Sequence, residues 1–229
     1  MFIETRFHGP DGSANGGYAA GLLAGHVPTD TVTVTLRLPP PLGIGLAVTQ
    51  EDDRGHDVRL WDGERLIAEA RTGAIAVPPV PPVPFEQALE AAEKFRRNKE
   101  HPFPRCYVCG PERDAGDGLR LEPGLVGDGI VASPWEPVGT PDEATVWAAL
   151  DCPGAWAFDS SGRPMVLGTM TAQVTGLPAE GERCVVMGLA RSREGRKLHA
   201  ATAVYGADGR LLGRAEQIWI EIDPERFGT

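Results

Sequence analysis

The sequence has no long apolar run, few cysteines and no excess of basic residues. No stretch approaches the roughly 18 apolar residues that a membrane-spanning helix needs, so no membrane span is expected. The N-terminus shows no apolar signal segment, and four cysteines in 229 residues is low usage; both favour a cytoplasmic protein with reduced thiols. A net charge of -10 argues against a nucleic-acid partner, because nucleic-acid binding requires a basic surface.

Two common catalytic motifs are absent as well. The chain has no Gly-x-Ser-x-Gly nucleophile elbow and no phosphate-binding glycine loop with a lysine. What remains is an ordinary globular composition, with 41% hydrophobic and 24% charged residues. The length suits one large domain or two of about 110 residues each.

Two distant segments, residues 62–75 and 208–220, are similar to each other. Each begins with Asp-Gly and continues as a strand-like run, and one gapped residue in the turn aligns their apolar positions. The aligned pairs are Leu66 with Leu211, Ala70 with Ala215 and Ile75 with Ile220. This self-similarity predicts a duplicated domain, with an active site between two unlike halves.

Each half shows the same predicted order, one apolar helix followed by antiparallel strands. The helices are expected at 19–25 and 146–158. Apolar patterning predicts strands at 32–38, 43–48, 58–60 and 66–77 in the first half and at 130–133, 167–174, 184–190, 198–205 and 211–222 in the second. A proline-rich linker at 78–84 and a helix at 85–99 separate the halves.

The segment that opens the second half carries a local motif. It reads Cys-Tyr-Val-Cys-Gly-Pro from Cys106, then Gly-Leu-Arg-Leu from Gly118. This motif and the element order resemble hotdog proteins of the thioesterase superfamily, and acyl-CoA thioesterase II in particular. The resemblance implies an α+β fold, a tandem (double) hotdog in which each half wraps a curved antiparallel sheet around one central helix. Its parts would be 1–77 (first half), 78–100 (linker and helix) and 101–229 (second half).

Asp151 lies inside the apolar segment of the second predicted helix. A buried carboxylate is costly unless it is partnered or functional, and burial can give it the raised pKa of a general base. Acyl-CoA thioesterase II proteins carry an Asp on this helix, a Thr on the next strand and a Gln on the last strand, which together hold the attacking water. The matching residues here are Asp151, Thr169 (or, second in order, Thr171) and Gln217.

The turn Asn15-Gly16-Gly17 precedes the first predicted helix and resembles the His-Gly-Gly of the superfamily, with Asn in place of His. Backbone N–H groups at a helix start carry partial positive charge, so the Gly17 amide would polarise the thioester carbonyl. Asn15 and Gly16 would complete this substrate-binding turn. Ala24 stands where the superfamily often has an acid, so one composite site is expected rather than two.

Each of these residues also has a plain structural interpretation. Asp151 could cap a helix that starts at Cys152. Gln217 could be a satisfied amide on an apolar strand face, and Thr169 an ordinary strand residue. The Gly-Gly pair could be a simple turn into a helix.

Cys106 and Cys109 are spaced as in a zinc knuckle, but one knuckle supplies only two of the four ligands of a tetrahedral site. The spare soft ligands are His101, Cys152 and Cys184. None of them belongs to a second paired motif, so free structural thiols are favoured and no metal or cofactor is expected.

The densest basic stretch of this acidic chain is 191–199, at a predicted hairpin. A CoA or carrier-protein phosphate could bind there through Arg193, Arg196 or Lys197. A solvated hairpin turn is the alternative.

The sequence therefore predicts a thioesterase that hydrolyses an acyl-CoA or acyl-carrier thioester by water attack, with a homo-oligomer left open. The first alternative is a non-catalytic hotdog protein that binds an acyl or other small apolar ligand. The second is a hotdog hydratase or dehydratase, although the MaoC-type Asp with His five residues on does not occur in this chain.

Overall fold

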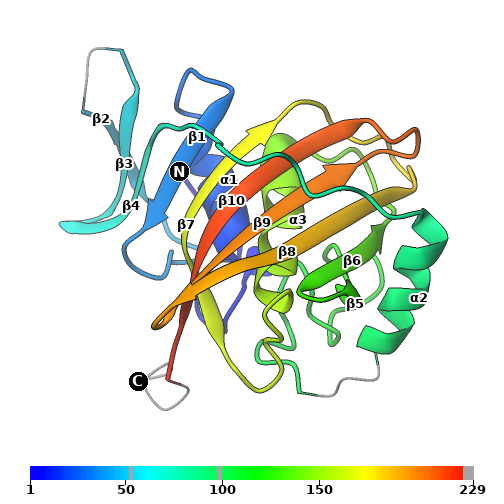
Figure 1. Ribbon diagram of the computed structural model, residues 1–229. Helices are drawn as coiled ribbons and strands as arrows, with labels where there is room; N and C mark the ends of the chain where they lie inside the picture. Colours follow the sequence, from blue (N-terminus) through cyan, green and yellow to red (C-terminus); the bar gives the residue numbers. More distant parts are fainter. Residues whose placement is uncertain (52–53, 97–99, 224–229) are drawn as a thin grey trace.

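The structure, a computed structural model, describes residues 1–51, 54–96 and 100–223. A ten-stranded antiparallel sheet curves around two helices that lie side by side, α1 and α3 (Figure 1). The helices are η1 (Thr5–Phe7, a 3-10 turn), α1 (Gly16–Ala24), α2 (Phe85–Phe95) and α3 (Glu143–Trp156). The strands are β1 (Thr31–Leu36), β2 (Ala47–Gln50), β3 (Asp57–Asp62), β4 (Arg65–Thr72), β5 (Gly124–Gly127), β6 (Ile130–Trp135), β7 (Met165–Val174), β8 (Cys184–Glu194), β9 (Lys197–Tyr205) and β10 (Leu211–Glu221).

The sheet order shows two equivalent halves. It runs β2-β3-β4-β1-β7-β10-β9-β8-β6-β5, so β1-β4-β3-β2 on one side mirrors β7-β10-β9-β8 on the other. Antiparallel pairing of β1 with β7, with Val34 opposite Met170, joins the halves into one sheet. The two similar sequence segments fall on the β3–β4 hairpin and on β10 with the turn before it, which are equivalent places in the two halves.

Helix α1 packs closely against α3 because glycines face the contact. A Cβ atom at Gly17 would lie 2.5 Å from the Cβ of Asp151, and one at Gly21 would lie 2.7 Å from the Cα of Ala144. Carbon atoms in contact normally stay about 3.5–4.0 Å apart. The glycines that weaken α1 as an isolated helix therefore allow the approach that brings its first turn to Asp151.

Helix α3 begins earlier than the sequence suggested. Its N-cap is Asp142, whose side chain accepts a hydrogen bond from the Thr145 N–H at 2.8 Å. Asp151 thus lies in the helix interior, and the interpretation that it caps a helix from Cys152 is wrong. Pro153 is accommodated inside the last turns.

Most strands lie where apolar patterning predicted them, with shifted ends. Strand β2 begins at Ala47 rather than at 43, because the preceding residues pair with the N-terminal segment: the N–H groups of Gly43 and Leu46 donate to the carbonyls of Ile3 and Met1. The short strand β5 was not predicted. Helix α2 is described to Phe95, and the predicted end of this helix at 99 lies outside the described residues.

The segment between the halves crosses the outer face of the sheet (Figure 1). The N–H groups of Ala76 and Val77 donate to Glu216 on β10, and the Tyr205 hydroxyl on β9 donates to the Val80 carbonyl at 2.8 Å. The chain then enters α2, which packs against β5 and β6. The opposite, inner face of the sheet is left to α1 and α3. Within the described ranges, no helix is both long enough and apolar enough to cross a bilayer.

Candidate active site

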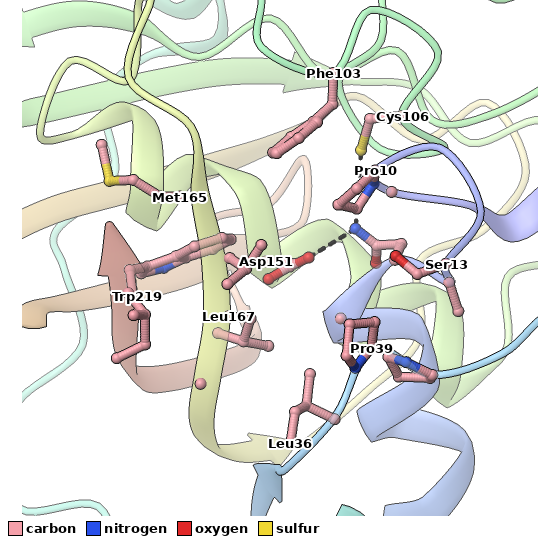
Figure 2. Close-up of a pocket in the computed structure, with 18 of the residues that line it drawn as sticks. Pro10, Ser13, Leu36, Pro39, Phe103, Cys106, Asp151, Met165, Leu167 and Trp219 are labelled. Carbon is pink, nitrogen blue, oxygen red and sulfur yellow. Dashed lines mark hydrogen bonds between the residues drawn. The ribbon is translucent and has the colours of Figure 1, made fainter. Parts of the chain in front are cut away.

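A cavity of about 260 Å³ lies where the start of α1, the middle of α3 and the ends of β7 and β10 meet. Most of its wall is apolar, and Figure 2 shows Asp151 pointing into a space surrounded by larger side chains. The labelled apolar residues of this wall are Pro10, Leu36, Pro39, Phe103, Met165, Leu167 and Trp219. Asp151 and Arg37 are the only charged residues in the lining that the structure describes. A polar reaction centre in an apolar enclosure suits an acyl group better than a polar ligand.

The carboxylate of Asp151 is buried, with only 2% of the residue exposed. Its Oδ2 accepts hydrogen bonds from the Asn15 side chain at 2.7 Å and from the Gly17 N–H at 3.1 Å. Its Oδ1 has no hydrogen-bond partner among the described residues. Burial is the largest cause that raises the pKa of Asp151 to about 7; the Cys106 thiol adds to the rise, and the bonds from Gly17 and Asn15 oppose it.

Asn15 fixes the orientation of that carboxylate. It is the N-cap of α1, where its Oδ1 accepts from the Tyr18 N–H at 2.9 Å. The amide NH₂ must then face away from the helix, and it donates to Asp151 and, at 3.9 Å, to the Cys106 sulfur. Asn15 was expected to bind substrate; in this structure it holds the carboxylate, and it also lines the cavity.

The first turn of α1 leaves one amide free. The sequence predicts that the Gly17 N–H faces the thioester carbonyl. In the structure this N–H donates to Asp151 and holds the carboxylate. The N–H groups of Tyr18 and Ala19 are taken by the side chain and the carbonyl of Asn15. The Gly16 N–H has no partner in the described part of the chain, and Gly16 lines the cavity.

Gln217 is close to Asp151 but does not face the cavity. Its Nε2 donates to the backbone carbonyls of Leu150 (2.6 Å) and Asp151 (3.2 Å). Its Oε1 accepts from the Trp219 indole N–H at 2.9 Å. The expected place beside the attacking water is thus corrected: Gln217 ties β10 to the backbone of α3, and Trp219 in turn lines the cavity.

Thr169 lies on the opposite side of the sheet from Asp151. Its hydroxyl is 3.4 Å from that of Thr35 on β1, in a half-buried position. A register shift opposite Ile218 and Trp219 lets Leu167 face the core while Thr169 faces out. The structure therefore does not bring Thr169 to the carboxylate, and Thr171, hydrogen-bonded to Thr33 at 2.8 Å, is on the same outer face.

The basic hairpin between β8 and β9 is exposed. Arg193 pairs with Glu221, which also accepts from Arg163 at 3.1 Å. Arg196 is in the turn and Lys197 begins β9; none of the three predicted basic residues lines the cavity.

Sequence reasoning missed Arg37, which follows β1, lines the cavity and pairs with Glu69 at 2.6 Å. It also missed the grouping of three thiols. Cys152, next to Asp151 on α3, meets the pair Cys106 and Cys109, and the sulfur atoms of all three lie within 4.8 Å of one another. Hydrogen bonds from the Cys109 and Cys152 thiols hold the pKa of the Cys106 thiol well below its usual value.

Comparison with known proteins gives matches in structure alone. No family model matches the chain, and no curated protein matches its sequence. Among solved structures, the tesB protein of Mycobacterium avium subsp. paratuberculosis aligns with a TM-score of 0.59 and 14% identity, over 93% of this chain and 89% of that protein. A candidate thioesterase from Novosphingobium aromaticivorans aligns with a TM-score of 0.65 and 14% identity, over 97% and 94%.

A third match is a conserved protein of unknown function with a hot dog fold from Alicyclobacillus acidocaldarius. It aligns with a TM-score of 0.62 and 14% identity, over 97% of this chain and 92% of that one. The predicted α+β fold, a tandem hotdog, is confirmed by these full-length alignments. At such low identity the likeness establishes the fold, and the chemistry must be argued from the site.

Proposed function

We propose that the protein is a thioesterase that hydrolyses an acyl-CoA or acyl-carrier thioester, with Asp151 as the general base. The observation that supports this most strongly is the state of the Asp151 carboxylate. One oxygen is held by two hydrogen bonds, and the other has no protein partner at the wall of an apolar cavity. A buried acceptor without a partner is costly, so it indicates a place for water or a ligand.

In the proposed reaction, a water molecule donates a hydrogen bond to Asp151 Oδ1 and attacks the thioester carbonyl carbon. The carboxylate takes the proton of the water as the new C–O bond forms. The resulting oxyanion accepts a hydrogen bond from the Gly16 N–H, at the positive end of α1. Collapse of the tetrahedral intermediate breaks the C–S bond, and the proton passes from Asp151 to the leaving thiolate.

The two halves contribute different parts to this mechanism. The second half supplies the base on α3, and the first half supplies both the groups that orient it and the free amide. Asn15 and Gly17 act as positioning residues, since they hold Oδ2 and leave Oδ1 without a partner among the described residues. Gln217 is an indirect positioning residue, because it binds the backbone of α3 at Asp151 rather than the carboxylate itself.

The apolar wall would enclose the acyl group, and the phosphates of CoA would lie outside it. Arg37 is the cationic residue of the lining and is about half exposed, so it is our first candidate for a phosphate contact. Arg193 and Arg196 with Lys197 are a second, more distant candidate site. The full-length structural neighbour from Novosphingobium aromaticivorans is itself described as a candidate thioesterase, which supports the proposal.

A non-catalytic binding protein is the main competing proposal, because the same cavity could simply retain an apolar ligand. A panel of short, medium, long and aromatic acyl-CoAs, followed by thiol release, tests the two together. Hydrolysis of at least one member with turnover supports the thioesterase. Folded protein that releases no thiol but retains an acyl ligand in native mass spectrometry contradicts it. A change in enoyl absorbance without thiol release would instead indicate a hydratase or dehydratase.

A further inference from the structure

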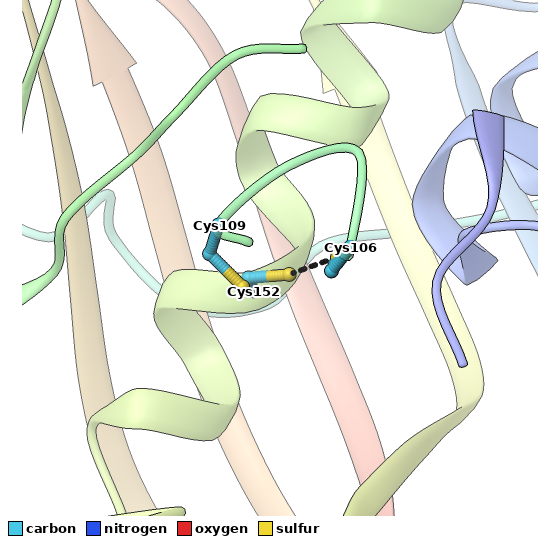
Figure 3. A group of neighbouring side chains, drawn as sticks. All are labelled: Cys106, Cys109 and Cys152. Atoms are coloured by element: carbon cyan, nitrogen blue, oxygen red, sulfur yellow. Dashed lines mark hydrogen bonds between the residues drawn. The ribbon is translucent and has the colours of Figure 1, made fainter. Parts of the chain in front are cut away.

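Three buried cysteines from two distant parts of the chain meet beside the cavity (Figure 3). Cys106 and Cys109 lie in the loop that opens the second half, and Cys152 lies on α3. Their exposed fractions are 3%, 5% and 7%, and all three are free thiols. The sulfur atoms of Cys106 and Cys152 are 3.7 Å apart, and every pair in the group is within 4.8 Å.

We propose that Cys106, Cys109 and Cys152 form a binding site for one thiophilic divalent cation of the zinc class. Zinc–sulfur bonds of about 2.3 Å in a tetrahedral site place neighbouring sulfur atoms about 3.8 Å apart. The Cys106–Cys152 separation of 3.7 Å meets this requirement without movement. Thiolate ligands select soft or borderline cations over magnesium or calcium. Binding is a proton exchange: each thiol that coordinates gives its proton to solvent, and no electron is transferred.

The fold sets two of these ligands by a tight turn. The Gly110 N–H donates to the Cys106 carbonyl at 2.9 Å and closes the loop around the pair. A Cβ at position 110 would lie 2.5 Å from the Cys106 backbone nitrogen, so glycine is required there. The turn thus points the sulfur atoms of Cys106 and Cys109 toward the same side, where α3 presents Cys152.

A neighbouring group would support a coordinated thiolate. The Asn15 amide, held by Tyr18 and Asp151, points a hydrogen toward the Cys106 sulfur at 3.9 Å. Groups around a metal commonly fix its ligands through such N–H contacts. Asn15 therefore touches both the proposed base and the proposed cation site.

The fourth position of a tetrahedral site has no His, Cys, Asp or Glu ligand within the ranges that the structure describes. His101, the nearest imidazole in sequence, accepts the Phe103 N–H at its Nδ1, so its proton is on Nε2 and that atom cannot coordinate as it stands. Cys106 and Cys152 both line the cavity. We assign the fourth position to a water molecule from that side.

Such a cation would fasten the loop of Cys106 and Cys109 to α3, one residue from Asp151. This inference goes beyond the proposed function and does not depend on it, because a binding site can be present whether or not the protein hydrolyses thioesters. Binding to the folded state alone should raise the thermal unfolding midpoint as zinc is added.

Cobalt is the appropriate probe, since Co²⁺ bound by thiolates shows sulfur-to-cobalt charge-transfer absorption that Zn²⁺ then abolishes by displacement. The full-length protein is stripped with a chelator under reductant, and four reduced thiols are verified after denaturation. It is then titrated with Co²⁺. The variants are Cys152→Ser and Cys109→Ser, with Cys184→Ser as the matched control, because Cys184 is buried but lies outside the cluster.

We expect one equivalent of Co²⁺ to saturate the charge-transfer band in the wild type and in Cys184→Ser, with loss of at least nine-tenths of the band in Cys152→Ser and Cys109→Ser. Near-ultraviolet circular dichroism checks that each variant is folded. No band in reduced, folded wild type would overturn the site. An undiminished band in folded Cys152→Ser or Cys109→Ser would overturn this ligand set. If one variant fails to fold, the other decides.

Discussion

Replacing Gly17 in the first turn of α1 by alanine should cost far more stability than the same change at Gly25, the C-cap of that helix. A Cβ at Gly17 would lie 2.5 Å from the Asp151 Cβ and 2.7 Å from the Trp147 carbonyl oxygen. The second contact is with backbone, which cannot rotate away. Relief requires α1 and α3 to separate by about 1 Å, because ordinary contacts are about 3.5–4.0 Å.

The expected magnitude has two parts. Overpacking of this kind costs about 1–3 kcal/mol in the free energy of unfolding. Separation also stretches the Gly17 N–H bond to the Asp151 carboxylate, and bonds to charged groups contribute about 1.5–3 kcal/mol. The two parts together predict that Gly17→Ala loses about 2.5–6 kcal/mol. At Gly25 the nearest atom is 3.6 Å away and φ is -60°, so alanine should be neutral or should stabilise by about 0.4–1 kcal/mol.

Urea unfolding monitored by tryptophan fluorescence and by circular dichroism measures both variants on the same scale. The two probes should report coincident transitions, with a lower midpoint for Gly17→Ala only. Equal midpoints for Gly17→Ala and Gly25→Ala would refute the close packing of α1 on α3, and with it the placement of Asn15 and Gly17 around Asp151.

Three further changes test the roles assigned to individual residues. Gln217→Leu should lower the free energy of unfolding by about 2–4 kcal/mol, because it leaves the buried Trp219 indole N–H without its partner and removes the bonds from Gln217 to the α3 backbone; a change below about 1 kcal/mol in urea unfolding would contradict these bonds. Thr169→Val should leave any thioester hydrolysis within about twofold, since the half-buried Thr169 hydroxyl faces Thr35 on the outer side of the sheet, away from Asp151, whereas a hundredfold loss would return Thr169 to the site. Arg37→Ala should raise KM for acyl-CoA but not for an acyl-pantetheine, which lacks the nucleotide phosphates; equal effects on both would remove Arg37 from phosphate binding.

The sequence revealed the repeat and the position of the carboxylate because both leave local signals. Asp151 is an acid in an apolar segment, and the structure buries it as that pattern predicts. The glycine turn was informative for a similar reason. Sequence could not decide which amide of that turn is free, because the choice depends on where α3 lies: the Asp151 carboxylate occupies the Gly17 N–H and leaves Gly16 available.

The remaining errors come from contacts between distant segments. Strand alternation places Thr169 with Thr171, opposite Met170 and Ala172, and both threonines lie on the outer face; Thr169 entered the candidate site only through the family resemblance. Gln217 was identified as an amide that needs a partner, and only the structure shows that the partner is the backbone of α3. Cys152 joins the cysteine pair across 46 residues of chain, a spacing that no local motif encodes.

The most direct test of Asp151 as the general base compares Asp151→Asn with Asp142→Asn in thiol release from the best acyl-CoA substrate. Each change replaces one carboxylate by an amide. Asparagine at 142 can still cap α3. Asparagine at 151 can still accept the hydrogen bonds from Asn15 and Gly17 through its side-chain oxygen. We expect at least a hundredfold loss of kcat for Asp151→Asn, within the range typical of removing a general base, and near wild-type turnover for Asp142→Asn. Turnover by folded Asp151→Asn equal to that of the wild type would contradict this role of Asp151.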